Sequence, residues 1–79
     1  MFEIGDTVFV KDIPDGYPFR LRGEIGTVCT PARSGYGIGV RFSKVFSGGH
    51  NCGGSCPSGY GYYLPDYVLS KMIVVVRFG

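Results

Sequence analysis

The side chains of this 79-residue chain with the most capacity for chemistry are its three cysteines and its single histidine. His50, Cys52 and Cys56 lie together in the stretch GGHNCGGSCPSGYGYY, residues 48–63, and Cys29 lies upstream. Thiolates and imidazole suit tetrahedral Zn²⁺, and a structural ion would help to stabilise so small a domain. One interpretation is therefore a structural zinc site formed by His50, Cys52, Cys56 and Cys29.

Two other chemistries fit the same residues less well. A disulfide between Cys52 and Cys56 is geometrically feasible, but the odd number of cysteines and a reducing compartment oppose it. A cysteine nucleophile activated by His50 would need an orienting carboxylate or a rigid element, and this glycine-rich stretch offers neither. We therefore expect no catalytic residues and no enzyme activity.

The favoured interpretation is a long surface loop without a cofactor. Its glycines would adopt turns with positive φ, and His50 would hydrogen-bond to the backbone and hold the loop against the rest of the domain. Loops on a rigid scaffold often carry recognition. Structural zinc is the alternative for the same segment.

The composition indicates the kind of fold that must position these residues. Apolar residues make up 44% of the chain and charged residues 18%, with 14 glycines, six tyrosines and six phenylalanines. This suits short strands joined by glycine-rich turns better than helices. The net charge of +2 is too weak for the dense basic patch of a typical nucleic-acid binder. The chain shows neither a signal peptide nor an apolar run long enough to span a bilayer, so we expect a cytoplasmic protein without membrane contact.

Five short strands are predicted, over residues 7–11, 24–30, 37–42, 60–64 and 72–78. In the third, Ile38, Val40 and Phe42 share one face by the two-residue period, and a single 3₁₀ turn is expected near residues 64–67. No window shows a helical apolar period. The chain therefore predicts one all-β domain over residues 1–79, a small five-stranded SH3-like antiparallel barrel with essentially no α-helix.

Three resemblances accompany this prediction. Residues 5–10 (GDTVFV) and 22–28 (RGEIGTV) resemble the opening of KOW-type SH3-like domains, which implies association with nucleic acid. Residues 39–42 (GVRF), 49–53 (GHNCG) and 60–63 (YGYY) are similar to part of a CAP-Gly domain, which implies binding to acidic, aromatic-ended tails. The whole chain resembles short SH3-like proteins of bacteriophages and mobile elements, which implies an accessory module that engages a host protein in the bacterial cytoplasm.

Tyrosines and arginines supply the candidate binding residues. Neighbouring strand residues point to opposite faces, so Tyr62 or Tyr63 must face outward. Exposed tyrosines favour a protein interface. We expect a non-enzymatic module that binds or inhibits a host protein through Tyr17, Phe19, Tyr36, His50, Asn51, Tyr62 and Tyr63. The alternative is KOW-like nucleic-acid binding through Arg20, Arg22, Arg33 and Arg41.

The last predicted strand, residues 72–78, is apolar on both faces. A half-buried strand should alternate apolar and polar residues, and an uncovered apolar edge invites pairing with another chain. We therefore expect self-association, such as a homodimer, through Val74, Val75 and Val76.

Overall fold

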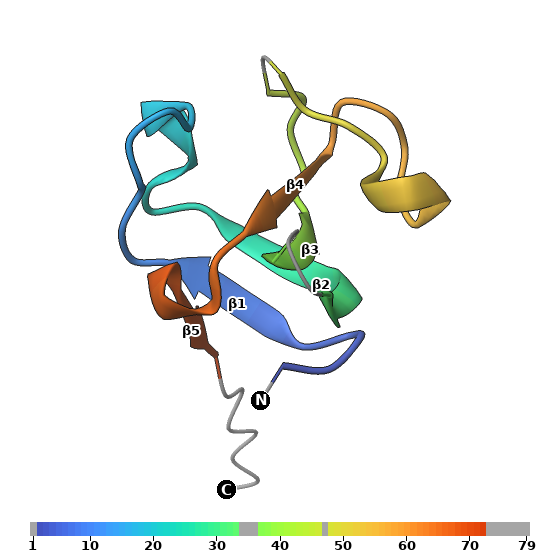
Figure 1. The fold of residues 1–79 in the computed structure, drawn as a ribbon, viewed down its shortest axis with the longest axis horizontal. Helices are drawn as coiled ribbons and strands as arrows, with labels where there is room; N and C mark the ends of the chain where they lie inside the picture. The colour runs from blue at the N-terminus through green and yellow to red at the C-terminus, as the bar shows by residue number, and fades with distance from the viewer. Residues whose placement is uncertain (1, 34–36, 47, 73–79) are drawn as a thin grey trace, which may run out of the picture.

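The computed structural model describes residues 2–33, 37–46 and 48–72, with the side chains of residues 31–33 excepted. Its strands are β1 (Thr7–Val10), β2 (Ile25–Arg33), β3 (Gly37–Arg41), β4 (Gly61–Leu64) and β5 (Leu69–Lys71). They form one antiparallel sheet in the order β4-β3-β2-β1-β5 (Figure 1). The predicted all-β class with five antiparallel strands is confirmed.

The helical elements are three short 3₁₀ turns: η1 (Phe19–Leu21), η2 (Cys52–Gly54) and η3 (Asp66–Val68). Within the described residues there is no α-helix, and no helix is long and apolar enough to cross a bilayer. The strands β4 and β5 are the two edges of the sheet, and no pairing of described residues joins them. The sheet is therefore open, and closure into a barrel is not confirmed.

The position of the last strand differs from the prediction. The structure places β5 at Leu69–Lys71, where it pairs with β1, and Met72 follows the strand. Leu69 pairs with Val10 of β1 and is buried there. In the sequence, this single apolar residue is a weaker strand signal than the apolar run that follows it. Most of the predicted segment, including the self-association residues Val74, Val75 and Val76, lies outside the described residues.

One face of the sheet carries the hydrophobic core. Val8, Val28, Val40 and Leu64 are almost fully buried there, and the predicted alternation of Ile38, Val40 and Phe42 is confirmed. Leu21 of η1, Val68 of η3 and Phe46 complete this inner face. Figure 1 shows η1 and η3 on the side of β1, with η2 on the opposite side of the view. The core therefore leaves the outer face of β2, β3 and β4 available for the cysteines.

A β-bulge in β2 changes which side chains reach that outer face. Val28 pairs with Val40, but the next pair is Thr30 with Gly39, so β2 contains one residue more than β3 across this step. A bulge of this kind re-aims side chains next to it. Both Cys29 and Thr30 consequently lie on the side of the sheet that the loop after β3 covers.

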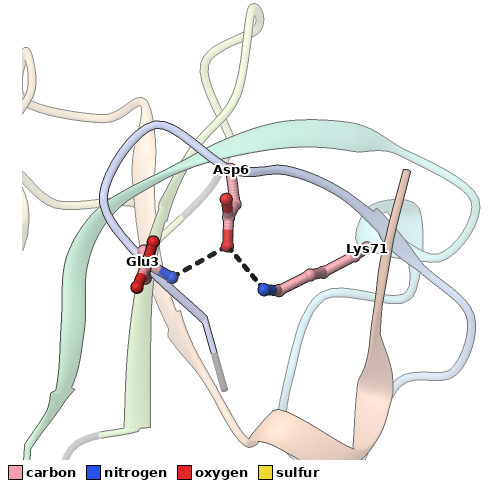
Figure 2. A network of polar contacts seen from close by, with 3 residues as sticks. All are labelled: Glu3, Asp6 and Lys71. Atoms are coloured by element: carbon pink, nitrogen blue, oxygen red, sulfur yellow. Dashed lines mark hydrogen bonds and ion pairs between the residues drawn. The ribbon is translucent and has the colours of Figure 1, made fainter. Parts of the chain in front are cut away.

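Near the chain's start, Asp6 forms a small polar network with β5 (Figure 2). Its Oδ2 accepts the Glu3 backbone N–H at 2.8 Å and lies 3.2 Å from Lys71 Nζ. The hydrogen bond from Glu3 first, and then Lys71, lower the pKa of the Asp6 carboxyl. The ionised carboxylate therefore favours the folded state above the ordinary pKa of about 3.9, and this contribution is lost as the pH falls below that value.

We expect Asp6→Asn to reduce stability slightly at neutral pH and to flatten the loss of stability below about pH 4, because the variant has no carboxylate to protonate there. The effect should be small and should shrink in high salt, since both charged groups are partly exposed. Urea unfolding at several pH values measures it, with Asp15→Asn, at an exposed position, as the control. A variant that keeps the steep acid dependence of the native chain would contradict the assignment.

Candidate metal centre

The three cysteine thiols converge on the outer face of the sheet. The Sγ atoms of Cys29, Cys52 and Cys56 all lie within 4.8 Å of one another. Cys29 comes from the bulge of β2, while Cys52 and Cys56 come from the loop of residues 48–60, called here the cysteine loop. Zinc–sulfur bonds of about 2.3 Å in a tetrahedron place sulfurs roughly 3.8 Å apart. A contraction of about 1 Å or less would thus bring the three thiols to ligating distance.

Two glycines form the floor beneath the thiols. A Cβ on Gly61 of β4 would lie 2.6 Å from Cys52 Sγ and 2.7 Å from Cys56 Sγ. A Cβ on Gly39 of β3 would lie 3.3 Å from Cys52 Sγ and 2.7 Å from Thr30 Cβ. Glycine in a strand commonly marks such a close approach. The thiols can reach the sheet because these two positions carry no side chain.

Backbone hydrogen bonds hold the cysteine loop against β4 and stabilise its turns. His50 and Gly61 exchange two N–H···O bonds of 2.9 and 2.8 Å, and Asn51 O accepts from the N–H groups of Gly54 and Cys56. Four glycines of the loop have positive φ, as predicted, and Cys52 is the described non-glycine residue with a positive φ, 49°. The structure therefore strains Cys52 while it directs the thiol toward the other two.

His50 is not part of the thiol group, which corrects the predicted four-residue set. Its Nδ1 accepts the backbone N–H of Cys52 at 2.9 Å, and its ring lies over Tyr63 with centroids 4.8 Å apart. The expected hydrogen bond between His50 and the loop backbone is confirmed, with the backbone N–H of Cys52 as the donor. His50 therefore positions Cys52 and does not join it as a ligand in this geometry.

A second polar contact joins the loop to the bulge. Thr30 is buried, and its Oγ1 lies 3.1 Å from Ser55 Oγ and 3.4 Å from the carbonyl oxygen of Cys52. Thr30, Ser55, Gly39 and Gly61 were not among the site residues predicted from the sequence. The sequence signal for this packing was a glycine at an outward position in each of two strands, because glycine in a strand often marks a close approach of another segment.

Burial and mutual proximity disfavour the thiolate forms of the loop cysteines. Burial raises the pKa of the Cys52 thiol, and the neighbouring charge of Cys29 raises it further. Burial likewise raises the pKa of Cys56, which the charge of Arg41 counteracts to a smaller extent. Thiols this close together cannot all ionise unless a positive charge sits between them. Without a cation the thiols of Cys52 and Cys56 are therefore protonated and weak nucleophiles.

The predicted tyrosine surface is divided between the two faces of the sheet. Tyr62 is 7% exposed and belongs to the core, so Tyr63, half-buried beside His50, is the outward member of the pair. Tyr17 is half-buried, with its ring 6.5 Å from that of Tyr62. Phe19 is exposed in η1, Asn51 is exposed in the cysteine loop, and Tyr36 lies outside the described residues.

The predicted arginines do not share one cavity. Arg20 lines a cavity with Glu24 and Lys44, while Arg41 lines another with Ile25, Pro57 and Tyr60. Arg22 is exposed just after η1. Arg33 ends β2, and only its backbone is described.

Comparison of the chain with protein-family models, with curated proteins and with solved structures found no match. The KOW-type, CAP-Gly and phage resemblances therefore stay predictions from the sequence.

Proposed function

We propose that this chain is a small, non-enzymatic metal-binding module in which Cys29, Cys52 and Cys56 hold one zinc ion. The observation that carries the proposal is the convergence of three Sγ atoms within 4.8 Å from two distant segments of the chain. The ion would link Cys52 and Cys56 of the cysteine loop to Cys29 of β2 and so restrict the loop to one conformation.

Zinc suits this donor set better than a hard cation would. Thiolates favour Zn²⁺, Cu(I) and iron–sulfur clusters, whereas Mg²⁺ and Ca²⁺ require oxygen ligands. Three thiolates around Zn²⁺ leave one net negative charge, and Arg41 supplies a positive charge that already acts on Cys56. The donors and their surroundings therefore support a thiolate-bound d¹⁰ ion.

The size of the domain gives the ion a structural purpose. A chain of 79 residues buries a limited core, and the cysteine loop contributes only Cys52 as a buried apolar side chain. The ion would bind the folded chain, in which Cys29 and the cysteine loop are together, and would so favour that state over the unfolded one. Metal binding would thus stabilise the cysteine loop, which contributes little to the hydrophobic core.

The proposal predicts one zinc per chain and a large stabilisation by the ion. At a free zinc concentration near 1,000 times Kd, the gain is about 4 kcal/mol, or roughly 15–30 °C in Tm for a domain of this size. Native mass spectrometry and thermal unfolding with and without a chelator measure both. A freshly reduced chain that shows no zinc adduct and no shift in Tm would refute the proposal.

A second candidate function is recognition of another protein beside the metal. A surface cavity of about 370 Å³ is lined by Ile25, Arg41, Pro57 and Tyr60, and Pro57 directly follows Cys56. Ile25 is 52% exposed and pairs with Phe9, which is 36% exposed. This apolar surface with one arginine supports binding to a protein segment with apolar and acidic residues, in keeping with the phage-type host-interaction module that the sequence suggests.

A tagged pull-down from bacterial lysate, with and without nuclease, tests this second function. The nucleic-acid alternative has less support, because the net charge is only +2 and Arg20 and Arg41 line separate cavities. A stoichiometric protein that survives nuclease and is lost with Arg41→Glu supports protein recognition at this cavity. Recovery that disappears with nuclease contradicts it.

A further inference from the structure

We infer that the bound metal keeps one coordination position for a ligand from outside the chain, and that this position accepts a thiolate. The inference rests on the proposed three-cysteine metal site and goes beyond its structural role. It makes the module a receptor for a thiol at the metal.

The part of the chain that the structure describes supplies three ligands. Every His, Cys, Asp and Glu of the sequence lies in the part of the chain that the structure describes, and only the three cysteines gather. Glu24 is paired with Lys44 and Asp6 with Lys71, each at 3.2 Å. A tetrahedral ion at the cluster therefore has one position that none of these side chains fills.

His50 is the other side chain of the cysteine loop that commonly binds zinc, and three restraints hold it elsewhere. Its Nδ1 is occupied by the N–H of Cys52, its ring lies over Tyr63, and its backbone is paired with Gly61. Moving the imidazole to the metal would break the hydrogen bond that orients Cys52. The geometry thus uses His50 to place a ligand and leaves the fourth position empty.

The open position must point away from the sheet. Gly39 and Gly61 bring the backbone directly beneath the sulfurs, so no further ligand fits on that side. Cys29 and Cys56 are only half-buried, and Ser55 between the two loop cysteines is exposed. A small molecule can therefore approach the ion from solvent.

The surroundings favour binding of a soft anion over activation of water. Hydrolysis by a metal-bound water usually needs a nearby base, and among the described residues no carboxylate joins the cluster while the Nδ1 of His50 is engaged. Thiolate is a preferred donor for zinc, so a fourth thiolate suits the ion chemically. Arg41 offsets part of the added negative charge, since its field reaches Cys56.

Cobalt substitution tests the inference on the full chain. Co²⁺ reports tetrahedral geometry in its visible bands and the number of Co–S bonds in its sulfur-to-metal charge-transfer band. We expect a three-sulfur spectrum in the absence of added thiol. Titration with 2-mercaptoethanol should then raise the charge-transfer band by about a third, saturably, as the sulfur ligands increase from three to four.

His50→Asn is the matched variant, because an asparagine side chain can also accept the N–H two residues on but cannot ligate through imidazole. Because His50 positions Cys52, the variant is expected to bind cobalt more weakly, but its saturated spectrum should keep the three-sulfur band positions and should still respond to thiol. A changed spectrum in this variant, no response of the native chain to thiol, or removal of cobalt by the thiol would overturn the inference.

Native mass spectrometry shows whether a fourth sulfur ligand comes from 2-mercaptoethanol or from a second copy of the chain. A monomer that carries one metal and one 2-mercaptoethanol supports the inference. A dimer with a four-sulfur spectrum before thiol is added overturns it, because a second copy then fills the position. Failure to bind cobalt or zinc at all would instead refute the proposed metal site.

Discussion

Cys52→Ser is expected to abolish tight zinc binding. Cys52 is the most buried of the three cysteines, at 1% exposure, and its sulfur rests on both Gly39 and Gly61. A serine hydroxyl is a poor ligand for an ion that prefers thiolates. Because Cys52 would contact the ion directly, the loss of affinity should exceed the roughly 10–100-fold that removal of an outer-shell partner causes. Competition with a chromophoric chelator measures it.

Ser55→Ala is the control for this prediction. Ser55 lies in the same loop and contacts Thr30 at 3.1 Å, but it offers no thiol. Its replacement should change zinc affinity only slightly.

Cys52→Gly distinguishes loss of the ligand from a folding defect. Glycine removes the thiol and also relieves the backbone strain at φ 49°. If Cys52→Ser and Cys52→Gly both fold and bind zinc as tightly as the native chain, the three-cysteine site is wrong.

Gly61→Ala should produce the second large effect, on stability and metal affinity together. The added methyl would lie 2.6 Å from Cys52 Sγ, 2.7 Å from Cys56 Sγ and 2.8 Å from the His50 carbonyl oxygen. Either the cysteine loop lifts away from β4 or the strand shifts beneath it. Overpacking of this kind typically costs about 1–3 kcal/mol, and displacement of two ligands should weaken zinc binding at least tenfold.

Gly54→Ala is the matched control for Gly61→Ala. Gly54 has a φ of 98°, and a Cβ there meets nothing within 4 Å. It should lower stability by about 1 kcal/mol through backbone strain alone and leave zinc affinity nearly unchanged. Chemical unfolding of the metal-free and zinc-bound forms distinguishes the two variants. Equal zinc affinity in Gly61→Ala and the native chain would show that the loop does not need the glycine floor.

The fold was predictable where strand periodicity and burial agree. The alternation of Ile38, Val40 and Phe42 specified both a strand and its buried face, and neighbouring Tyr62 and Tyr63 had to separate to opposite faces. The last strand was misplaced because Leu69 contributes a single buried side chain, whereas the following apolar run dominated the pattern. Barrel closure depends on how edge strands bend, which no local pattern encodes.

The cysteine site was predictable in its members and unpredictable in its geometry. Residue types identified all three cysteines, but the bulge that turns Cys29 outward follows from the pairing of β2 with β3. The exclusion of His50 depends on tertiary contacts, namely the hydrogen bond from the N–H of Cys52 to Nδ1, the ring contact with Tyr63 and the backbone pairing with Gly61. Alternative partners for an imidazole two residues from a cysteine are equally consistent with the sequence.

The bulge at Cys29 has a consequence for the order in which the protein folds. Cys29 reaches the other two cysteines only after β2, β3 and β4 have paired in register, because the extra residue in β2 sets its direction. An ion that binds only this paired arrangement would stabilise the native state and not the states that precede the pairing. An interaction that is absent from the transition state leaves the folding rate almost unchanged and slows unfolding. The ion would therefore slow the unfolding of the paired sheet and leave its rate of folding almost unchanged.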